Sequence, residues 1–272
     1  MFLTPDKKID EYGLTINEKL ITASSGVRYY SNRKLNTPGH KPMYVTIHNT
    51  PKINAAKGTT MAEQYSRATF NNNMGDVVVH YYIDGTDCWH ILADDIVGWH
   101  AADGVNGPGN TKSVAIEIIG ESSQAESRGA LLAAILLHRY GLGIERLKTH
   151  RDWYPQKYCP AYILPHWSSF VAKVQKNLAK IAAQDTETKP TPAQSASGKG
   201  FRVQVGYFGV KANAEKQRQL VKDAGFDVII KTAEDGIHWR VQAGYFKVRD
   251  NARDLVDKLH KAGFDAIIIE EG

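Results

Sequence analysis

The chain has 272 residues, of which 42% are hydrophobic and 23% charged, a balance that is typical of a folded globular protein. Its formal net charge of +5 would suit an anionic partner, but no local basic run of the nucleic-acid-binding type is present. Two cysteines are too few for a secreted disulfide scaffold, and no stretch is apolar enough to span a membrane.

The first two thirds of the chain alternate predicted strands and helices. A nearly continuous apolar run at 113–119 predicts a central strand that is buried on both faces. The other expected strands and helices lie at 44–48 and 77–83, and at 60–72, 125–140 and about 165–181. We therefore expect an α/β domain over residues 1–184, with a mixed central sheet flanked by helices.

Residues 185–200 contain no large apolar side chain and are dominated by Pro, Ser, Thr, Ala and Gly. Such a segment cannot bury enough surface to fold. It predicts a flexible linker between two domains.

Residues 201–272 contain an internal repeat. At a constant offset of 38, 15 of the 30 positions that start at Arg202 and Arg240 are identical. Each copy predicts a strand, a helix and a strand, the first copy at about 201–205, 214–224 and 228–230 and the last strand at 266–269. Two such units predict a small α+β domain with the ferredoxin-like βαββαβ order, with both helices on one face of the sheet and the other face open.

The most informative stretch for chemistry runs from His150 to Cys159. Its Pro and aromatic residues argue against a plain helix, and imidazole and thiolate are both good ligands for zinc. Lys157 lies two residues before the cysteine. We expect its charge to lower the pKa of the thiol and to face a substrate oxyanion.

Two further residues on predicted strands could complete such a site. His48 ends a strand on the face opposite Val45 and Ile47, so it is either a metal ligand or an imidazole that caps the following turn. Glu117 stands inside the apolar run, where burial would raise its pKa and suit it to general acid or base catalysis. The structural alternative is an ion pair between Glu117 and an arginine such as Arg151.

Two histidines and one cysteine leave the fourth position of a tetrahedral zinc ion for water, which indicates a catalytic metal. With a carboxylate and a lysine nearby, this is the equipment for metal-assisted amide hydrolysis, although no spacing identifies the amide. His80 and His100 are further metal or substrate candidates, and for each one alone a structural imidazole is favoured. Cys88 is expected to be a small core residue.

Five separated motifs occur together in a specific order: VTIHNT at 45–50, GWHA at 98–101, NGPGN at 106–110, SVAIEI at 113–118 and KYCP at 157–160. Over roughly residues 25–180 the chain thereby resembles the type-2 N-acetylmuramoyl-L-alanine amidases of phage endolysins and bacterial autolysins. The resemblance implies one zinc ion on His48, His150 and Cys159, with Glu117 as the acid/base residue and Lys157 as the cation on the oxyanion side. It also implies cleavage of the amide between the muramic-acid lactyl group and L-Ala, with His80 and His100 on the groove wall in contact with substrate.

The repeat resembles a SPOR-type peptidoglycan-binding domain. The pattern Val-Gln-x-Gly-x-Phe stands at 203–208 and 241–246, and Gly-Phe-Asp follows each copy. Such domains bind glycan strands, and the resemblance makes the open sheet face the candidate surface, with Gln204, Tyr207, Gln242 and Tyr245. The alternative is that these side chains alternate into packing.

These observations together predict a monomeric, modular peptidoglycan hydrolase whose partner is the cell wall, with no nucleic-acid partner and no membrane insertion. Residues 1–10 lack the apolar core of a secretory signal, so we expect synthesis in the cytoplasm and holin-type or lysis-dependent release. One alternative is a non-catalytic peptidoglycan-binding protein, against which Cys159, Glu117 and Lys157 argue. Another is a cytoplasmic muropeptide-recycling amidase, against which the wall-binding repeat argues.

Overall fold

The computed structural model describes residues 2–51, 54–188 and 200–271. The chain divides into two compact units, Met1–Ile181 and Ala182–Gly272. Residues 189–199 of the predicted linker lie outside the described residues, whereas residues 185–188 end a helix and Gly200 begins a strand. Within the described ranges, no helix combines the length and the apolar character that crossing a membrane requires.

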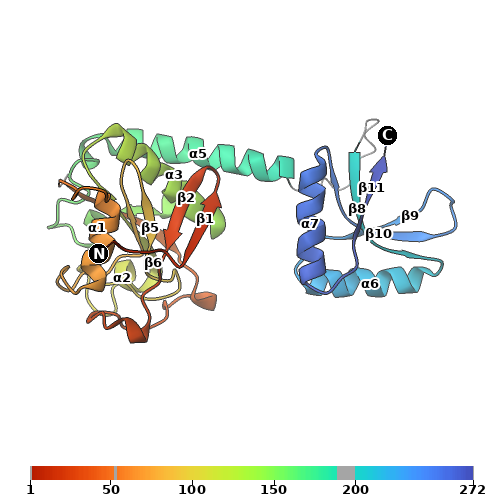
Figure 1. The fold of residues 1–272 in the computed structure, drawn as a ribbon, viewed down its shortest axis with the longest axis horizontal. Coiled ribbons are helices and arrows are strands. Elements are labelled where there is room, and N and C mark those ends of the chain that lie inside the picture. Colours follow the sequence, from red (N-terminus) through yellow and green to blue (C-terminus); the bar gives the residue numbers. More distant parts are fainter. Residues whose placement is uncertain (1, 52–53, 189–199, 272) are drawn as a thin grey trace. The chain divides into compact units, whose positions relative to one another are not determined.

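The first unit is built on a seven-stranded sheet in the order β1-β2-β5-β4-β6-β3-β7. Figure 1 labels β1, β2, β5 and β6 of this sheet. The strands are β1 (Lys7–Glu11), β2 (Leu14–Glu18), β3 (Tyr44–Thr50), β4 (Tyr81–Ile83), β5 (Cys88–His90), β6 (Ser113–Ile119) and β7 (Leu147–Thr149). The β1/β2 and β4/β5 pairs are antiparallel, and the other neighbours are parallel. The predicted mixed central sheet is confirmed.

Helices cover both faces of this sheet. Alternate residues of β6 divide between the two faces: Val114, Ile116 and Ile118 pack with α3 (Ser123–Arg139) and α5 (Trp167–Thr188). Ala115 and Ile119 pack on the opposite side, with α1 (Met61–Phe70). The expectation that residues 113–119 are buried on both faces therefore holds, and it explains why that run is almost continuously apolar.

The shorter helices of this unit lie in its connections. They are α2 (Pro108–Lys112), α4 (His150–Trp153) and the 3-10 helices Ala23–Ser25, Pro38–His40, Ile144–Arg146 and Leu164–His166. The strand expected at 77–83 begins only at Tyr81. Val78 hydrogen bonds its amide to the carbonyl of Trp99, so that part of the chain pairs with a loop and not with the sheet.

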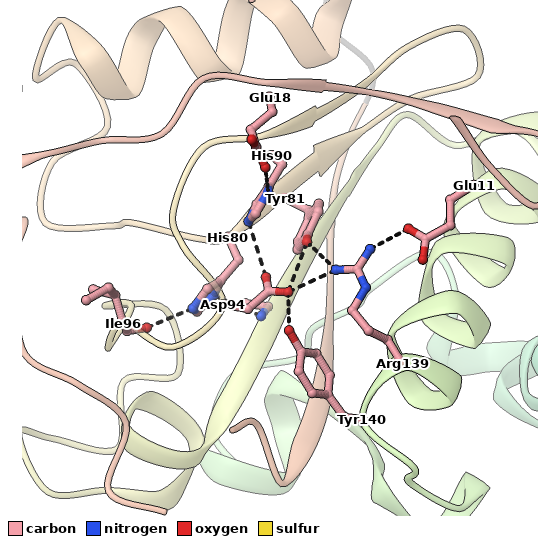
Figure 2. A network of polar contacts seen from close by, with 10 residues as sticks. Glu11, Glu18, His80, Tyr81, His90, Asp94, Ile96, Arg139 and Tyr140 are labelled. Carbon is pink, nitrogen blue, oxygen red and sulfur yellow. Dashed lines mark hydrogen bonds and ion pairs between the residues drawn. The ribbon is translucent and has the colours of Figure 1, made fainter. Parts of the chain in front are cut away.

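A polar network ties the N-terminal hairpin to the rest of the unit (Figure 2). Asp94 lies 3.0 Å from the Arg139 guanidinium and 3.2 Å from Nε2 of His90. Burial opposes ionisation of Asp94, but the hydrogen bond and charge of His90 outweigh it and hold the pKa of this carboxyl well below its usual range. Glu11 and Glu18 of the hairpin pair with Arg139 and His90. The hairpin is thereby joined to α3 and to the strand β5 beside it.

The second unit has the order β8 (Gly200–Phe208), α6 (Lys211–Asp223), β9 (Ile229–Thr232), β10 (Trp239–Phe246), α7 (Arg249–Lys261) and β11 (Ile267–Glu271). Its sheet runs β11-β8-β10-β9 with every neighbouring pair antiparallel. Val221 of α6 and Val256 of α7 join one apolar cluster with Val203 and Val205, so both helices cover the same face. This is the predicted ferredoxin-like arrangement.

Candidate metal centre and active site

Three side chains that the sequence predicted as metal ligands come together in the structure. His48, His150 and Cys159 are all buried, and one ligand atom from each lies within 4.8 Å of the others. Strands β3 and β7 are parallel neighbours with Ile47 opposite Thr149, so the residues that follow this pair, His48 and His150, lie side by side. Their ring centroids are 4.6 Å apart.

A tight loop returns Cys159 to His150. Helix α4 begins at His150 with Thr149 as its N-cap, and Thr149 and Asp152 satisfy each other's backbone amides in a capping box. The helix ends after one turn, as expected for so irregular a segment. The Arg151 amide then donates to the Cys159 carbonyl at 3.1 Å, which closes the loop.

The donor atoms of this cluster fit a zinc ion. Sγ of Cys159 lies 3.8 Å from Nδ1 of His48. Tetrahedral zinc with ordinary bond lengths would hold a sulfur and a nitrogen ligand about 3.5 Å apart. Nε2 of His150 is buried and has no hydrogen-bond partner among the described residues, as a nitrogen reserved for a metal would be.

The electrostatics of the cluster differ in one respect from expectation. Burial raises the pKa of the Cys159 thiol to about 11, and the charge of Lys157 only reduces this rise. The predicted lowering of the thiol pKa by Lys157 is therefore outweighed by burial. Burial also holds the pKa of His48 well below its usual value, with smaller contributions from His150 and Lys157. The site disfavours positive charge on its own groups, and a cation would ionise the thiol.

Glu117 stands beside the cluster, on the same face of the sheet. It lies directly opposite His48 in the parallel β3/β6 register and keeps partial exposure. Burial raises its pKa to about 7, against the smaller opposing effects of a hydrogen bond with Thr50 and the charge of Lys157. Among the described residues Glu117 forms no ion pair, and Arg151 lies instead over the Tyr158 ring at 5.4 Å. The alternative of a Glu117–Arg151 pair is wrong.

Sequence reasoning missed a tyrosine in this neighbourhood. Burial, followed by the charge of Glu117, raises the pKa of Tyr65 on α1, against an opposing effect of the Thr50 side chain. Its place on the sheet-facing side of α1 follows from helical periodicity, but its nearness to Glu117 depends on how α1 packs across the strand ends. No local pattern could have revealed it.

The two remaining candidate histidines have different surroundings. His80 is completely buried; its Nε2 lies 2.9 Å from the Ile96 carbonyl (Figure 2), and its Nδ1 accepts the Ala115 amide at 3.0 Å. Both of its ring nitrogens are thus used inside the protein. His100 is 6% exposed, and its Nδ1 lies 3.1 Å from Nε2 of His48. The structure therefore places His100 behind a candidate metal ligand.

The segment that carries His100 is held by Asn110. Its side-chain oxygen accepts the amides of His100 and Ala101 at 2.9 and 2.8 Å, and its amide donates to the Gly104 carbonyl. This explains structurally why the sequence pairs a GWHA motif with an asparagine ten residues later. Asn110 was not singled out as a functional residue from the sequence.

A pocket of about 740 Å³ opens at the same edge of the sheet. The lining comes from the start of α1, the β4–β5 turn and the segment after β6, and includes Met61, Asp84, Gly85, Gly120 and Glu121. Since β3, β4 and β6 are mutually parallel, their carboxyl ends meet here. The pocket thus lies beyond the strand ends that carry His48 and Glu117.

The four candidate residues of the second unit are not equivalent. Gln204 and Gln242 face each other across β8 and β10, but only 3% of Gln242 is exposed. Tyr207 is 47% exposed, donates a hydrogen bond to Asp235 and stacks on His238. Tyr245 is half-buried beside Gly200.

A buried pair of histidines and a cysteine at the carboxyl ends of an α/β sheet, with a carboxyl group beside them, is the donor arrangement of a catalytic zinc centre. The comparisons with known proteins agree with this class. A family profile described as N-acetylmuramoyl-L-alanine amidase matches residues 38–162, and the SPOR domain profile matches residues 197–270.

Two curated relatives are N-acetylmuramoyl-L-alanine amidases of Bacillus subtilis strain 168. CwlA is 30% identical over 67% of this chain and 70% of its own length, and CwlH is 35% identical over 57% of this chain and 60% of its own length. Among solved structures, the catalytic domain of XlyA is 29% identical with a TM-score of 0.50, over 58% of this chain and 98% of that domain. The chain belongs to the N-acetylmuramoyl-L-alanine amidase family, which confirms the family identified from its sequence motifs.

Proposed function

We propose that the protein is a zinc-dependent peptidoglycan hydrolase that cleaves the amide bond between N-acetylmuramic acid and the L-Ala of the stem peptide. The observation that carries this proposal is the buried cluster of His48, His150 and Cys159 with Glu117 opposite His48. The family and its amidase relatives support the same bond.

In this proposal one zinc ion, when bound, supplies the Lewis acidity that makes amide hydrolysis feasible near neutral pH. Glu117 accepts a proton from the attacking water and returns it to the amine that leaves with L-Ala. A pKa of about 7 suits both halves of that transfer. Lys157, whose charge acts on Glu117 and on all three candidate ligands, stabilises the carbonyl oxygen as it becomes negative.

We further propose that the pocket beyond β3 and β6 accepts part of the stem peptide. Its support is its position at the edge of the sheet that carries His48 and Glu117, together with its lining of backbone and polar side chains. A soluble stem peptide should shift the backbone NMR signals of Gly85 and Gly120. Shifts that avoid both glycines would place the peptide elsewhere.

For the whole chain we propose a catalytic domain at 1–184 and a wall-binding domain at 201–272, joined by the segment 185–200, whose first four residues end helix α5. Gln204, Tyr207 and Tyr245 are the candidate glycan contacts of that last domain, and the buried Gln242 supports Gln204 from the neighbouring strand. All three metal ligands come from one chain, which supports a monomer; a dimer mass by light scattering would contradict it. Access to the wall through holin-type or lysis-dependent release predicts that activity appears in the medium only on lysis.

Mass analysis of digested cell walls tests the function directly. We expect new L-Ala amino termini, no new reducing ends and loss of both activity and bound zinc when a chelator is added. New reducing ends without new amino termini would mean a glycosidase. Cleavage that persists in metal-free protein would exclude the zinc mechanism.

A further inference from the structure

A chain of buried polar groups runs from the surface of the first unit to the candidate metal ligand His48. Trp153 Nε1 lies 2.9 Å from Thr46 Oγ1, which lies 2.9 Å from Ser113 Oγ. Ser113 Oγ lies 2.6 Å from the Gly109 carbonyl oxygen and 3.4 Å from Nε2 of His100. Nδ1 of His100 then lies 3.1 Å from Nε2 of His48.

Two groups that contact the hydroxyls of Thr46 and Ser113 can play only one hydrogen-bonding role each. An indole N–H can only donate, so Thr46 accepts from Trp153. A carbonyl oxygen can only accept, so Ser113 donates its single hydroxyl proton to the Gly109 carbonyl. The contact between the two hydroxyls then requires that Thr46 donates to Ser113.

The same reasoning determines where the protons of His100 lie. Because the proton of Ser113 is already used, the contact with Nε2 of His100 is a hydrogen bond only if that nitrogen carries the hydrogen. A neutral His100 therefore has a bare Nδ1. This nitrogen accepts from Nε2–H of His48, which leaves Nδ1 of His48 without a hydrogen.

That bare nitrogen is the one that faces the other candidate ligands, since Nδ1 of His48 lies 3.8 Å from Sγ of Cys159. Metal-bound histidines usually donate their second N–H to a carboxylate or a carbonyl, which accept unconditionally. A neutral imidazole accepts only in one of its two tautomers, so a histidine in this position needs something further to set its own proton.

We propose that the Gly109 carbonyl, Ser113 and His100 form a tautomer relay that holds His48 with its hydrogen on Nε2 and its Nδ1 free for the metal. His100 is then a positioning residue that acts through His48. The role of the relay in metal binding rests on the proposed zinc site. The positions of the protons on His48 and His100, in contrast, depend only on hydrogen bonds within this protein.

Burial gives the relay its strength. Thr46 and Ser113 are 0% exposed, so a group that loses its partner there finds no water to replace it. The close packing around these groups also depends on Gly109. A Cβ at this position would come within 2.6 Å of the Trp153 ring and 2.5 Å of the Ala101 methyl group, so only glycine lets α2 approach closely enough.

Long-range proton–nitrogen NMR of metal-free protein labelled at histidine nitrogen tests the assignment without any variant. We expect His48 and His100 both to carry hydrogen on Nε2 and to be bare at Nδ1. Hydrogen on Nδ1 of either ring would overturn the relay.

The second test replaces Ser113 by alanine, which removes the hydroxyl that accepts Nε2–H of His100. We expect the Nδ1–H tautomer of His48 to become populated and zinc affinity, measured by competition with a chromogenic chelator, to fall about 10- to 100-fold. Ser113→Thr, which keeps a hydroxyl, should alter neither, and the same holds for Ser66→Ala, the matched change at a buried serine on α1.

Unchanged tautomers and zinc affinity in Ser113→Ala would overturn the proposal. A parent protein that shows the expected tautomers but binds no zinc would instead refute the metal site and leave the proton assignment in place. If Ser113→Ala does not fold, His100→Phe serves in its place, because it removes the nitrogen that accepts Nε2–H of His48. It should populate the Nδ1–H tautomer of His48, and no shift would count against the relay.

Discussion

The two units place their candidate functional groups in opposite environments. In the first unit, His48, His100, His150 and Cys159 are buried and most of their polar atoms have assigned partners. In the second unit, the stack of Tyr207 on His238 and its hydrogen bond to Asp235 stand exposed. A buried group that loses its partner costs the full desolvation penalty, whereas exposed polar pairs contribute little. Substitutions of candidate functional residues should therefore have large effects on binding and activity in the first unit and small effects in the second.

The largest effect is expected for Cys159→Ala. Loss of one of three protein ligands should remove bound zinc, measured by metal analysis, and with it all detectable release of L-Ala amino termini. Cys88→Ala is the matched control, because Cys88 is a free, buried cysteine in the core of the same unit. It should reduce stability but retain zinc; equal loss of zinc in both variants would mean that the metal is lost through unfolding.

Glu117→Gln should leave zinc bound and reduce kcat by about 10²- to 10⁴-fold, the usual contribution of a general acid/base residue. The exposed Glu145, in the 3-10 helix Ile144–Arg146, supplies a control in Glu145→Gln. A nearly normal kcat in Glu117→Gln would return Glu117 to a structural role.

In metal-free protein, Glu117→Gln should also change how stability depends on pH. The pKa of Glu117 is raised from 4.5 to about 7 in the folded state, so between these values the folded chain holds a proton that the unfolded chain has lost. Its contribution therefore makes stability fall as pH rises through this window. Thermal melts should show a smaller decline for Glu117→Gln than for the parent, and parallel curves would contradict the raised pKa.

Lys157→Met should lower kcat by about 10²- to 10³-fold with little change in KM, as expected when an oxyanion-stabilising group is lost. Lys148 on the neighbouring strand β7 provides a control in Lys148→Met. A change in KM alone would indicate that Lys157 binds substrate in its ground state.

Truncation after Thr188 compares the two units directly. The shortened chain should hydrolyse soluble muropeptides at the parental rate, because every candidate catalytic residue lies before position 160. Cosedimentation with intact cell walls should fall severalfold. Unchanged sedimentation would show that the first unit binds walls by itself and would refute the tether.

The smallest effect is expected for Tyr207→Ala. Removal of one exposed ring should weaken wall binding by about 1–3 kcal/mol if a sugar stacks on it, and should leave zinc binding and soluble hydrolysis unchanged. Tyr29→Ala, at an exposed tyrosine of the first unit, is the control for general surface effects. Equal sedimentation of the two variants would remove Tyr207 from the binding surface.

The difference between the units also decides how much of each could be predicted. The repeat at 201–272 predicted the second unit's element order because each copy carries its own periodicity and helix stop. In the first unit, β1, β2, β5 and β7 were not predicted. Two of them, β5 and β7, are only three residues long and gain their stability from neighbours far away in sequence. Short strands carry too few alternating positions to be distinguished from loops.

The sequence by itself determined the family, the three candidate ligands and the face of β3 on which His48 lies, because strand alternation and motif order are local properties. The tertiary structure alone decided which groups the ring nitrogens of each histidine contact. His48, His80 and His100 stand in similar apolar surroundings in the sequence. They differ in the groups that their ring nitrogens meet, and for His48 these are 52 and 111 residues away. The position of an imidazole proton depends on those distant partners, so only the packed sheet decides which nitrogen of His48 faces Cys159 and places His100 behind the other.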